Sequence, residues 1–360
     1  METSSSGSST PPDIEKGESQ IQKQLTLTFR NLNVRVTAPD AALGSTLWSE
    51  VDPRQLGKLF KRRSSPQRTI FKDISGQVKP GEMLLILGRP GSGCTSLLNV
   101  LSNNRDTFNE VTGETRYGSM DHVAARQFRQ QIMFNNEDDL HFPTLTVNRT
   151  MKFALRNKVP DERPQQLRKR KDFVQEKRDD ILDSLGINHT KKTLVGNEFI
   201  RGVSGGERKR VSLAEVMAGQ SPVQMWDNPI RGLDSKAAVE FARMLRREAD
   251  DNRKTILATM YQAGNGIYDE FDKILVLAEG RVTYYGPRSL ARKYFEDLGF
   301  DCPRGANIAD FLTSVTVITE RLVRPGWEEK VPNTPEEFEA VYHAVSCIKL
   351  RWMQLCQLSI

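Results

Sequence analysis

The chain has 360 residues, enough for one large domain or two modest ones with a buried core. Its 52 lysines and arginines exceed its 46 aspartates and glutamates by a margin too small to indicate a nucleic-acid partner. The four cysteines show no C-x-x-C spacing, which excludes a disulfide framework and favours a reducing cytosol. No apolar run approaches the roughly 18 residues of a membrane-spanning helix, so we expect that this polypeptide does not cross a bilayer by itself.

The N-terminal residues 1–25 are rich in Ser, Thr, Pro and acidic side chains and lack the features of a signal peptide, which predicts a disordered tail. The two-residue alternation in Leu25–Phe29 and Leu32–Val36 predicts strands, and the folded domain is expected to begin there. Lys58–Pro66 is a basic loop that we interpret as solvated surface, with a lipid or nucleic-acid patch as the alternative.

A glycine-rich turn follows the apolar run Met83–Leu87 and precedes a predicted helix. In order, its residues are Gly88, Arg89, Pro90, Gly91, Ser92, Gly93, Cys94, Thr95 and Ser96. A strand, a glycine turn and a helix N-terminus direct backbone N–H groups at one point, where a phosphate can bind. The spacing matches the phosphate loop G-x-x-x-x-G-K-[S/T], except that Cys94 stands where lysine would neutralise the β- and γ-phosphates. Thr95 keeps a hydroxyl for Mg²⁺, so the pattern favours nucleotide binding over an ordinary turn and puts hydrolysis in question.

The remainder of the chain alternates helical and strand-like segments. Residues 160–184 are strongly charged with apolar positions at helical spacing, which predicts surface helices. Strand-length apolar runs follow at Val223–Trp226, Thr255–Thr259 and Lys273–Leu277, separated by helical stretches such as Ala237–Asp250. Strands that alternate with helices predict a parallel α/β sheet.

A second helix start carries a distinctive motif. Ser204, Gly205 and Gly206 precede a predicted helix over Glu207–Ala218, and the stretch from Val203 to Arg210 resembles the signature sequence of ATP-binding cassette (ABC) transporters. A plain helix cap is the alternative. The motif lies about 110 residues after the phosphate loop and about 20 before Asp227, a placement that supports the resemblance. In the family, this motif clasps the γ-phosphate of ATP that a partner domain holds.

The resemblance extends to further positions. It implies that Asp227, after a strand, holds the Mg²⁺ shell as the Walker B aspartate. It also implies that Asn228 replaces the glutamate base, that Tyr261 replaces the switch histidine, and that Glu137 replaces the Q-loop glutamine. The neutral amide of Asn228 can orient a water but cannot take its proton. We therefore expect Asn228, Tyr261 and Glu137, together with Cys94, to weaken catalysis.

This combination resembles the first nucleotide-binding domain of fungal pleiotropic-drug-resistance transporters of the ABCG type, over roughly Leu25 to Tyr342. The resemblance implies an α/β fold, the P-loop NTPase ABC-type nucleotide-binding domain with a RecA-like core and a helical subdomain. It implies that Gly88–Thr95 and Asp227 hold ATP and Mg²⁺ with little turnover. It further implies that Ser204, Gly205 and Gly206 complete the catalytic site of a second nucleotide-binding domain.

We accordingly expect a nucleotide-binding domain over residues 26–300, with its helical subdomain at about 141–215, a linker over 301–345 towards a transmembrane domain, and an atypical tail over 346–360. The implied partners are a second cassette and transmembrane domains outside this chain, with no nucleic acid. Through them the domain would lie on the cytosolic side of the plasma membrane.

Three alternatives stay open. The chain could be a truncated, non-transporting regulatory fragment in the cytoplasm, an active ATPase in which other groups replace Lys and Glu, or a soluble ABC protein of translation or DNA repair. The exported substrate is not encoded in these residues, and Phe60 and Phe71 are weak candidates for the aromatic that stacks on adenine.

Overall fold

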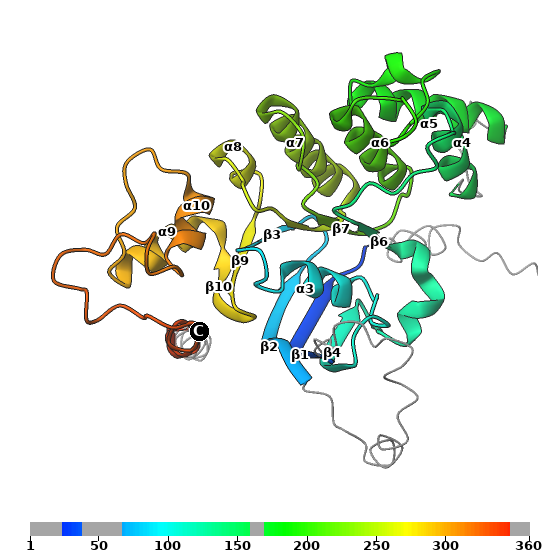
Figure 1. The fold of residues 1–360 in the computed structure, drawn as a ribbon. Helices are drawn as coiled ribbons and strands as arrows, with labels where there is room; N and C mark the ends of the chain where they lie inside the picture. Colours follow the sequence, from blue (N-terminus) through cyan, green and yellow to red (C-terminus); the bar gives the residue numbers. More distant parts are fainter. Residues whose placement is uncertain (1–23, 38–66, 159–168, 346–360) are drawn as a thin grey trace, which may run out of the picture.

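The computed structural model describes residues 24–37, 67–158 and 169–345. The expectations for the basic loop Lys58–Pro66, for Phe60 and for the tail over 346–360 lie outside these residues, as does nearly all of the predicted N-terminal tail. Two sheets and a group of helices make up the described part (Figure 1).

The central sheet has six strands in the order β10-β9-β3-β8-β7-β6, and all of its pairs are parallel except the one between β9 and β10. The strands are β3 (Met83–Gly88), β6 (Ile132–Asn135), β7 (Val223–Asp227), β8 (Thr255–Thr259), β9 (Lys273–Ala278) and β10 (Arg281–Pro287). Every residue of β3, β7 and β8 is buried, as expected for parallel strands covered on both faces. The predicted parallel α/β sheet is therefore confirmed.

A second sheet is antiparallel, with strand order β2-β1-β4-β5. Its members are β1 (Leu27–Thr37), β2 (Gln67–Val78), β4 (Glu110–Tyr117) and β5 (Met120–Asp121). The two strands predicted over Leu25–Val36 form the single strand β1. Its pairing shifts register between Phe29 and Leu32, where Asn31 adopts a positive φ of 48°, so the chain bulges without ending the strand.

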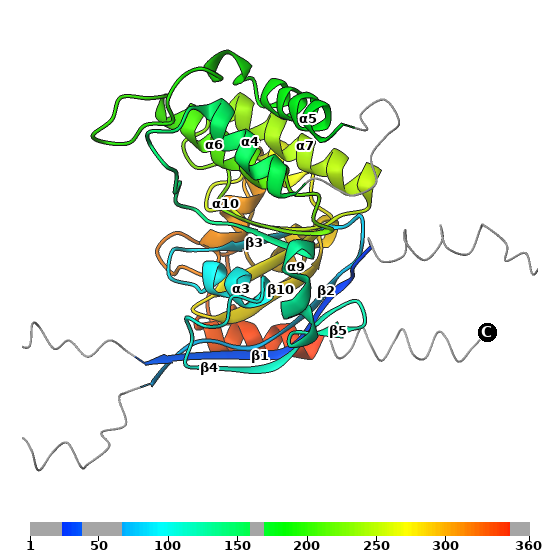
Figure 2. The same ribbon diagram turned by 90° about the vertical axis from the view of Figure 1, so that its right-hand side faces the viewer.

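Helices cover both faces of the central sheet (Figures 1 and 2). α3 (Cys94–Leu101) packs between the two sheets, in one cluster with Leu84 and Ile86 of β3. Met83, Leu85 and Leu87 alternate to the other face, where a second cluster includes residues of α7 to α10. These helices are α7 (Ser235–Asn252), α8 (Asn265–Tyr268), α9 (Arg288–Asp297) and α10 (Ile308–Ser314).

The segment 301–345, which we expect to lead towards a transmembrane domain, is packed onto the nucleotide-binding domain. It contains α10, and Phe311, Leu312 and Phe338 are buried in the same cluster as β3 and α9. Phe338 stacks on Phe300 with ring centroids 5.8 Å apart. Scattered aromatic residues in a polar stretch did not show a helical or strand period, so this burial was not visible from the sequence pattern.

The remaining helices form a group with its own core (Figure 2). η1 (Ala124–Gln131) precedes β6, and the group itself consists of α4 (Val147–Asn157), α5 (Arg170–Ser184), η3 (Asn188–Thr190) and α6 (Gly205–Met217). Its buried cluster spans Val147 to Ala218. The signature helix α6 begins two residues before the predicted start at Glu207, because Ser204 acts as its N-cap. Within the described ranges, no helix is long and apolar enough to cross a membrane.

Candidate functional site

Four chemically important loops meet at one edge of the central sheet. They follow β3, β6, β7 and β8, and parallel strands end at a common edge, where α/β proteins bind ligands. The loops carry the phosphate-loop residues, Glu137, Asn228 and Tyr261, respectively. Residues that are more than 100 positions apart are thereby brought together.

The phosphate loop wraps tightly between β3 and α3. Gly91 and Gly93 have φ values of 87° and 94°, a backbone region that favours glycine. A Cβ on Gly88 would lie 2.8 Å from the Cys94 Sγ and 2.9 Å from the Leu277 carbonyl oxygen, so no side chain fits there. Gly93 is the N-cap of α3 and supplies no side-chain cap, and the first turn holds no acidic residue. The terminus thus leaves N–H groups for an anion.

Cys94 occupies the lysine position as a neutral, buried thiol. Its side chain belongs to the core cluster beneath the loop, with 4% of the residue exposed. Burial raises the pKa of the Cys94 thiol to about 12, and the Asp227 carboxylate adds to the shift. Cys94 therefore supplies no positive charge to a phosphate at neutral pH.

The residues suited to bind Mg²⁺ lie around Asp227. The Thr95 Oγ1 donates to the Asp227 Oδ1 at 3.2 Å, and the Thr259 Oγ1 donates to the same oxygen at 2.5 Å. Burial raises the pKa of the Asp227 carboxyl above its ordinary value, and the two threonine hydrogen bonds oppose this shift. Among the described residues, no group of three or more His, Cys, Asp and Glu side chains could hold a metal. A hydroxyl and a carboxylate are the protein ligands of a Mg²⁺ that takes its other oxygens from phosphate and water, so the residues fit this ion.

Asn228 is held by two neighbouring loops. Its N–H donates to both the Thr259 carbonyl and the Thr259 Oγ1 at 3.0 Å, and its φ is 42°. Its Nδ2 donates to the Glu137 Oε1 at 2.9 Å, and the Arg231 Nη1 donates to the same oxygen at 2.9 Å. The carboxylate of this part of the site thus comes from Glu137, and it is already engaged by an amide and a guanidinium.

Tyr261 follows β8 by two residues and lines a cavity at the phosphate loop. The cavity has a volume of 540 Å³, and its wall also includes Thr95, Ser96, Val36 and Ile70. Burial raises the pKa of the Tyr261 phenol, so the group is neutral at pH 7. Phe71, proposed above for adenine stacking, is wrong for that role: it is only 1% exposed and packs in the core because the alternation of β2 turns it inward.

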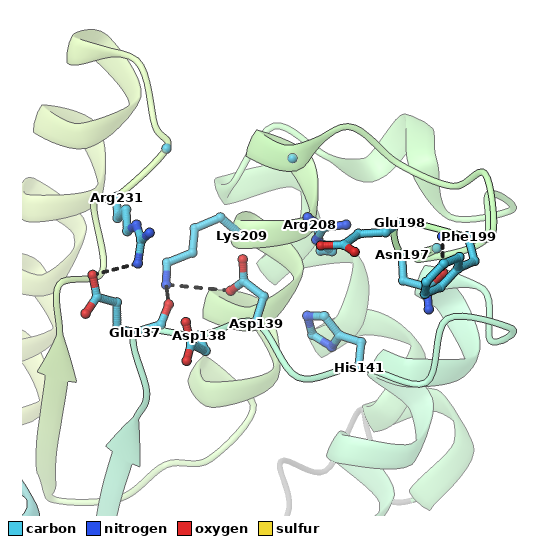
Figure 3. Close-up of a pocket in the computed structure, with 13 residues that line it drawn as sticks. Glu137, Asp138, Asp139, His141, Asn197, Glu198, Phe199, Arg208, Lys209 and Arg231 are labelled. Atoms are coloured by element: carbon cyan, nitrogen blue, oxygen red, sulfur yellow. Dashed lines mark hydrogen bonds and ion pairs between the residues drawn. The ribbon is translucent and has the colours of Figure 1, made fainter. Parts of the chain in front are cut away.

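The signature residues line a different cavity (Figure 3). It has a volume of 620 Å³, and Gly205, Arg208 and Lys209 of α6 form part of its wall. The Ser204 Oγ accepts from the Glu207 N–H at 3.3 Å while the Ser204 N–H donates to Glu207 Oε2 at 2.8 Å, a reciprocal capping box. No described residue lines both this cavity and the one at the phosphate loop.

Lys209 connects the signature helix to the loop that carries Glu137. It is only 2% exposed, and its Nζ donates to the Glu137 carbonyl oxygen at 2.8 Å and lies 3.6 Å from the Asp139 carboxylate (Figure 3). Three residues of the site, Lys209, Thr259 and Arg231, could not be predicted from the sequence. A basic residue within a charged helix carries no periodic signal, and only the folded chain shows its partners.

The chain is similar in sequence to ATP-binding cassette transporters. The family described as ABC transporter matches residues 71–231. The ABC multidrug transporter G of Aspergillus fumigatus is 76% identical over 343 residues, which cover 95% of this chain and 25% of that protein. The ABC-type transporter cns4 of Cordyceps militaris is 49% identical over 89% of this chain and 24% of its own length. The chain therefore spans about a quarter of the length of these relatives.

Two solved structures share the fold. The dimeric structure of a bacterial ABC transporter cassette has a TM-score of 0.54 at 17% identity and covers 73% of this chain and 98% of its own. A post-hydrolysis state of the same cassette, bound to ADP and Pi, has a TM-score of 0.55 at 19% identity with the same coverage. The α/β cassette fold expected from the sequence is confirmed.

Proposed function

Because the chain belongs to the ABC transporter family as an ATP-binding cassette, we propose that it holds ATP–Mg²⁺ with little hydrolysis and completes the ATP site of a second cassette. The proposal rests on one observation above all. The metal-binding pair Thr95 and Asp227 is intact, whereas the residues beside it offer neither a lysine nor a free carboxylate base.

The binding half of the proposal is supported by the phosphate loop. An uncapped α3 terminus and glycines with positive φ present backbone N–H groups to a polyphosphate. Thr95 and Asp227 would bind Mg²⁺, which neutralises phosphate charge when present. Two residues with aliphatic side chains in the cavity wall, Val36 and Ile70, would contact the base or the ribose.

The weak hydrolysis is supported by Asn228 and Glu137. A general base must accept a proton from the attacking water, and the Asn228 amide cannot do so at neutral pH. One oxygen of the Glu137 carboxylate accepts hydrogen bonds from both Asn228 and Arg231, and these contacts hold the carboxylate in place. Tyr261 is neutral and can donate a hydrogen bond but cannot act as an imidazole.

The action in trans is supported by the separation of the two helix termini. Gly205 at the start of α6 lines a cavity that shares no described residue with the phosphate-loop cavity, so the signature would act on a nucleotide held by another cassette. A Cβ on Gly205 would meet nothing within 4 Å, which leaves room for an incoming phosphate. The relatives named as multidrug transporters make an exporter of small organic molecules the context of this cassette.

The test uses the 360-residue chain with ATP and Mg²⁺. We expect saturable nucleotide binding and negligible phosphate release. Turnover faster than a few per minute without a partner would contradict the proposal, because it would approach the range of about 1 to 10³ per second of ordinary enzymes. If the unmodified chain had high ATPase activity and the Cys94→Lys, Asn228→Glu double variant had the same activity, the chain would be an active ATPase that uses other groups.

A further inference from the structure

The phosphate loop carries a cationic side chain of its own, Arg89, which lines the nucleotide cavity. The described lining of this cavity includes two charged side chains, Arg68 and Arg89, and no carboxylate. Arg89 is the first residue after β3 and lies within the phosphate loop itself. We propose that Arg89 replaces the missing lysine as the cation for the β- and γ-phosphates, and that Glu320 holds the guanidinium until nucleotide binds. This inference rests on the nucleotide binding proposed above.

Other cations at this edge of the sheet are occupied elsewhere. Lys209 is buried against the Glu137 carbonyl and the Asp139 carboxylate, and it lines the signature cavity. Arg231 pairs with the Glu137 side chain at 2.9 Å. Arg68 belongs to β2, where it is directly paired with Val36, and is therefore not part of the phosphate loop. Arg89 is the cation closest along the chain to the phosphate-binding N–H groups.

The present partner of Arg89 is easily exchanged. The Arg89 Nη2 lies 2.9 Å from the Glu320 Oε1, and both side chains are 49% exposed. Exposed ion pairs contribute little to stability, because water competes for both charges. A polyphosphate carries several negative charges and accepts two parallel N–H bonds from one guanidinium, so it competes effectively with one exposed carboxylate.

The position of Glu320 connects this exchange to the C-terminal segment. A neighbouring cavity of 1180 Å³ is lined by both Arg89 and Gly91 of the phosphate loop and residues 316–319. Release of Glu320 therefore frees the contact between the phosphate loop and the segment that leads to the buried residues Val331 and Phe338. Nucleotide binding would therefore change the contact between the phosphate loop and the segment that contains Glu320.

The experiment measures binding of a fluorescent methylanthraniloyl-ATP with Mg²⁺ to the full chain and to five variants. We expect Arg89→Ala to weaken binding about tenfold, a typical loss for one charge-assisted contact, whereas the control Arg304→Ala, an exposed arginine in a turn away from both cavities, keeps the affinity of the unmodified chain. Glu320→Gln should tighten binding about twofold, because it removes the competitor.

A lysine background isolates the charge from any effect on loop structure. In Cys94→Lys, the added ammonium supplies the cation, so Arg89→Ala in that background should cost less than about threefold. An equal loss in both backgrounds would show that Arg89 only supports the loop, and would overturn the inference. Equal affinities of Arg89→Ala and Arg304→Ala would overturn it as well. Failure of the unmodified chain to bind the probe would instead overturn the proposed function itself, together with this inference.

Discussion

The two glycine-flanked helix termini of this protein, at α3 and at α6, are built in opposite ways. The α3 terminus begins after Gly93, has no side-chain cap and no acid in its first turn, and lies at the edge of a sheet where Asp227 is close. The α6 terminus is closed by a reciprocal capping box between Ser204 and Glu207. The first terminus therefore leaves its N–H groups without a side-chain cap, whereas the second is closed by side chains of its own helix. This difference agrees with the proposal that α3 binds the nucleotide of its own chain and that α6 acts on a partner.

The largest expected effect concerns Cys94, at the start of α3. A helix N-terminus ordinarily lowers a thiol pKa, but burial here raises the pKa to about 12 from 9.0. The thiolate fraction at pH 8 should therefore be about a thousandfold lower than in the unfolded chain. Iodoacetamide labelling of Cys94, followed by peptide mass spectrometry in native buffer and in urea, measures the ratio. Equal rates would mean that the open terminus, and not burial, controls this residue.

Next in size is the effect of Asp227→Asn on Mg²⁺. Loss of the carboxylate should weaken Mg²⁺-dependent nucleotide binding by about a hundredfold, since one direct ionic ligand is removed. Titration with and without EDTA checks this result, and Asp301→Asn, an exposed aspartate in the C-terminal region, serves as the control. A variant that kept the full Mg²⁺ dependence would remove Asp227 from the metal site.

The same variant has an opposite effect on stability. Because burial raises the folded pKa of Asp227, its charged form disfavours folding at pH values above that pKa. Asp227→Asn should therefore increase the free energy of unfolding at pH 7, and the gain should shrink as the pH falls through the folded pKa. Urea unfolding at several pH values measures both. A loss of stability at pH 7 would contradict the assignment of burial as the dominant cause.

The α6 terminus should respond to Ser204→Ala with a loss of stability of about 1 kcal/mol, because the Glu207 N–H loses its acceptor. Nucleotide affinity of the same chain should not change, since Ser204 lies away from the phosphate-loop cavity. The matched control is Ser235→Ala at the start of α7, where Asp234 provides the cap. A drop in affinity would show that the two termini are coupled within one chain.

The smallest effect belongs to Glu207→Gln, which keeps the capping geometry and removes the charge. Backbone hydrogen bonding from Ser204 lowers the pKa of Glu207 below 4.5, so its contribution to stability is present at neutral pH and is lost as the pH falls through the folded pKa. The variant should lose less than about 1 kcal/mol at pH 7 and show a weaker acid dependence, measured against Glu176→Gln of α5. An unchanged acid dependence would contradict this role.

Much of the cassette could be predicted because its signals are local. The runs that became β7, β8 and β9 are of strand length and largely apolar, and the phosphate loop and Ser204–Gly206 are contiguous motifs. In the phosphate loop, Gly91 and Gly93 also adopt backbone conformations that favour glycine. The burial of aromatic residues in segment 301–345 could not be predicted, because these residues are separated by polar stretches and contact strands far away in sequence.

Sequence alone determined the presence of a phosphate-binding turn, the loss of its lysine and the second glycine-opened helix, because each depends on residues adjacent in the chain. Only the tertiary structure decided that Cys94 is buried and neutral, that Glu137 contacts Asn228 and Arg231, and that Arg89 faces Glu320. These properties depend on which loops the parallel strands bring to one edge and on how much water is excluded there. Strand order and burial are set by the packing of the whole chain.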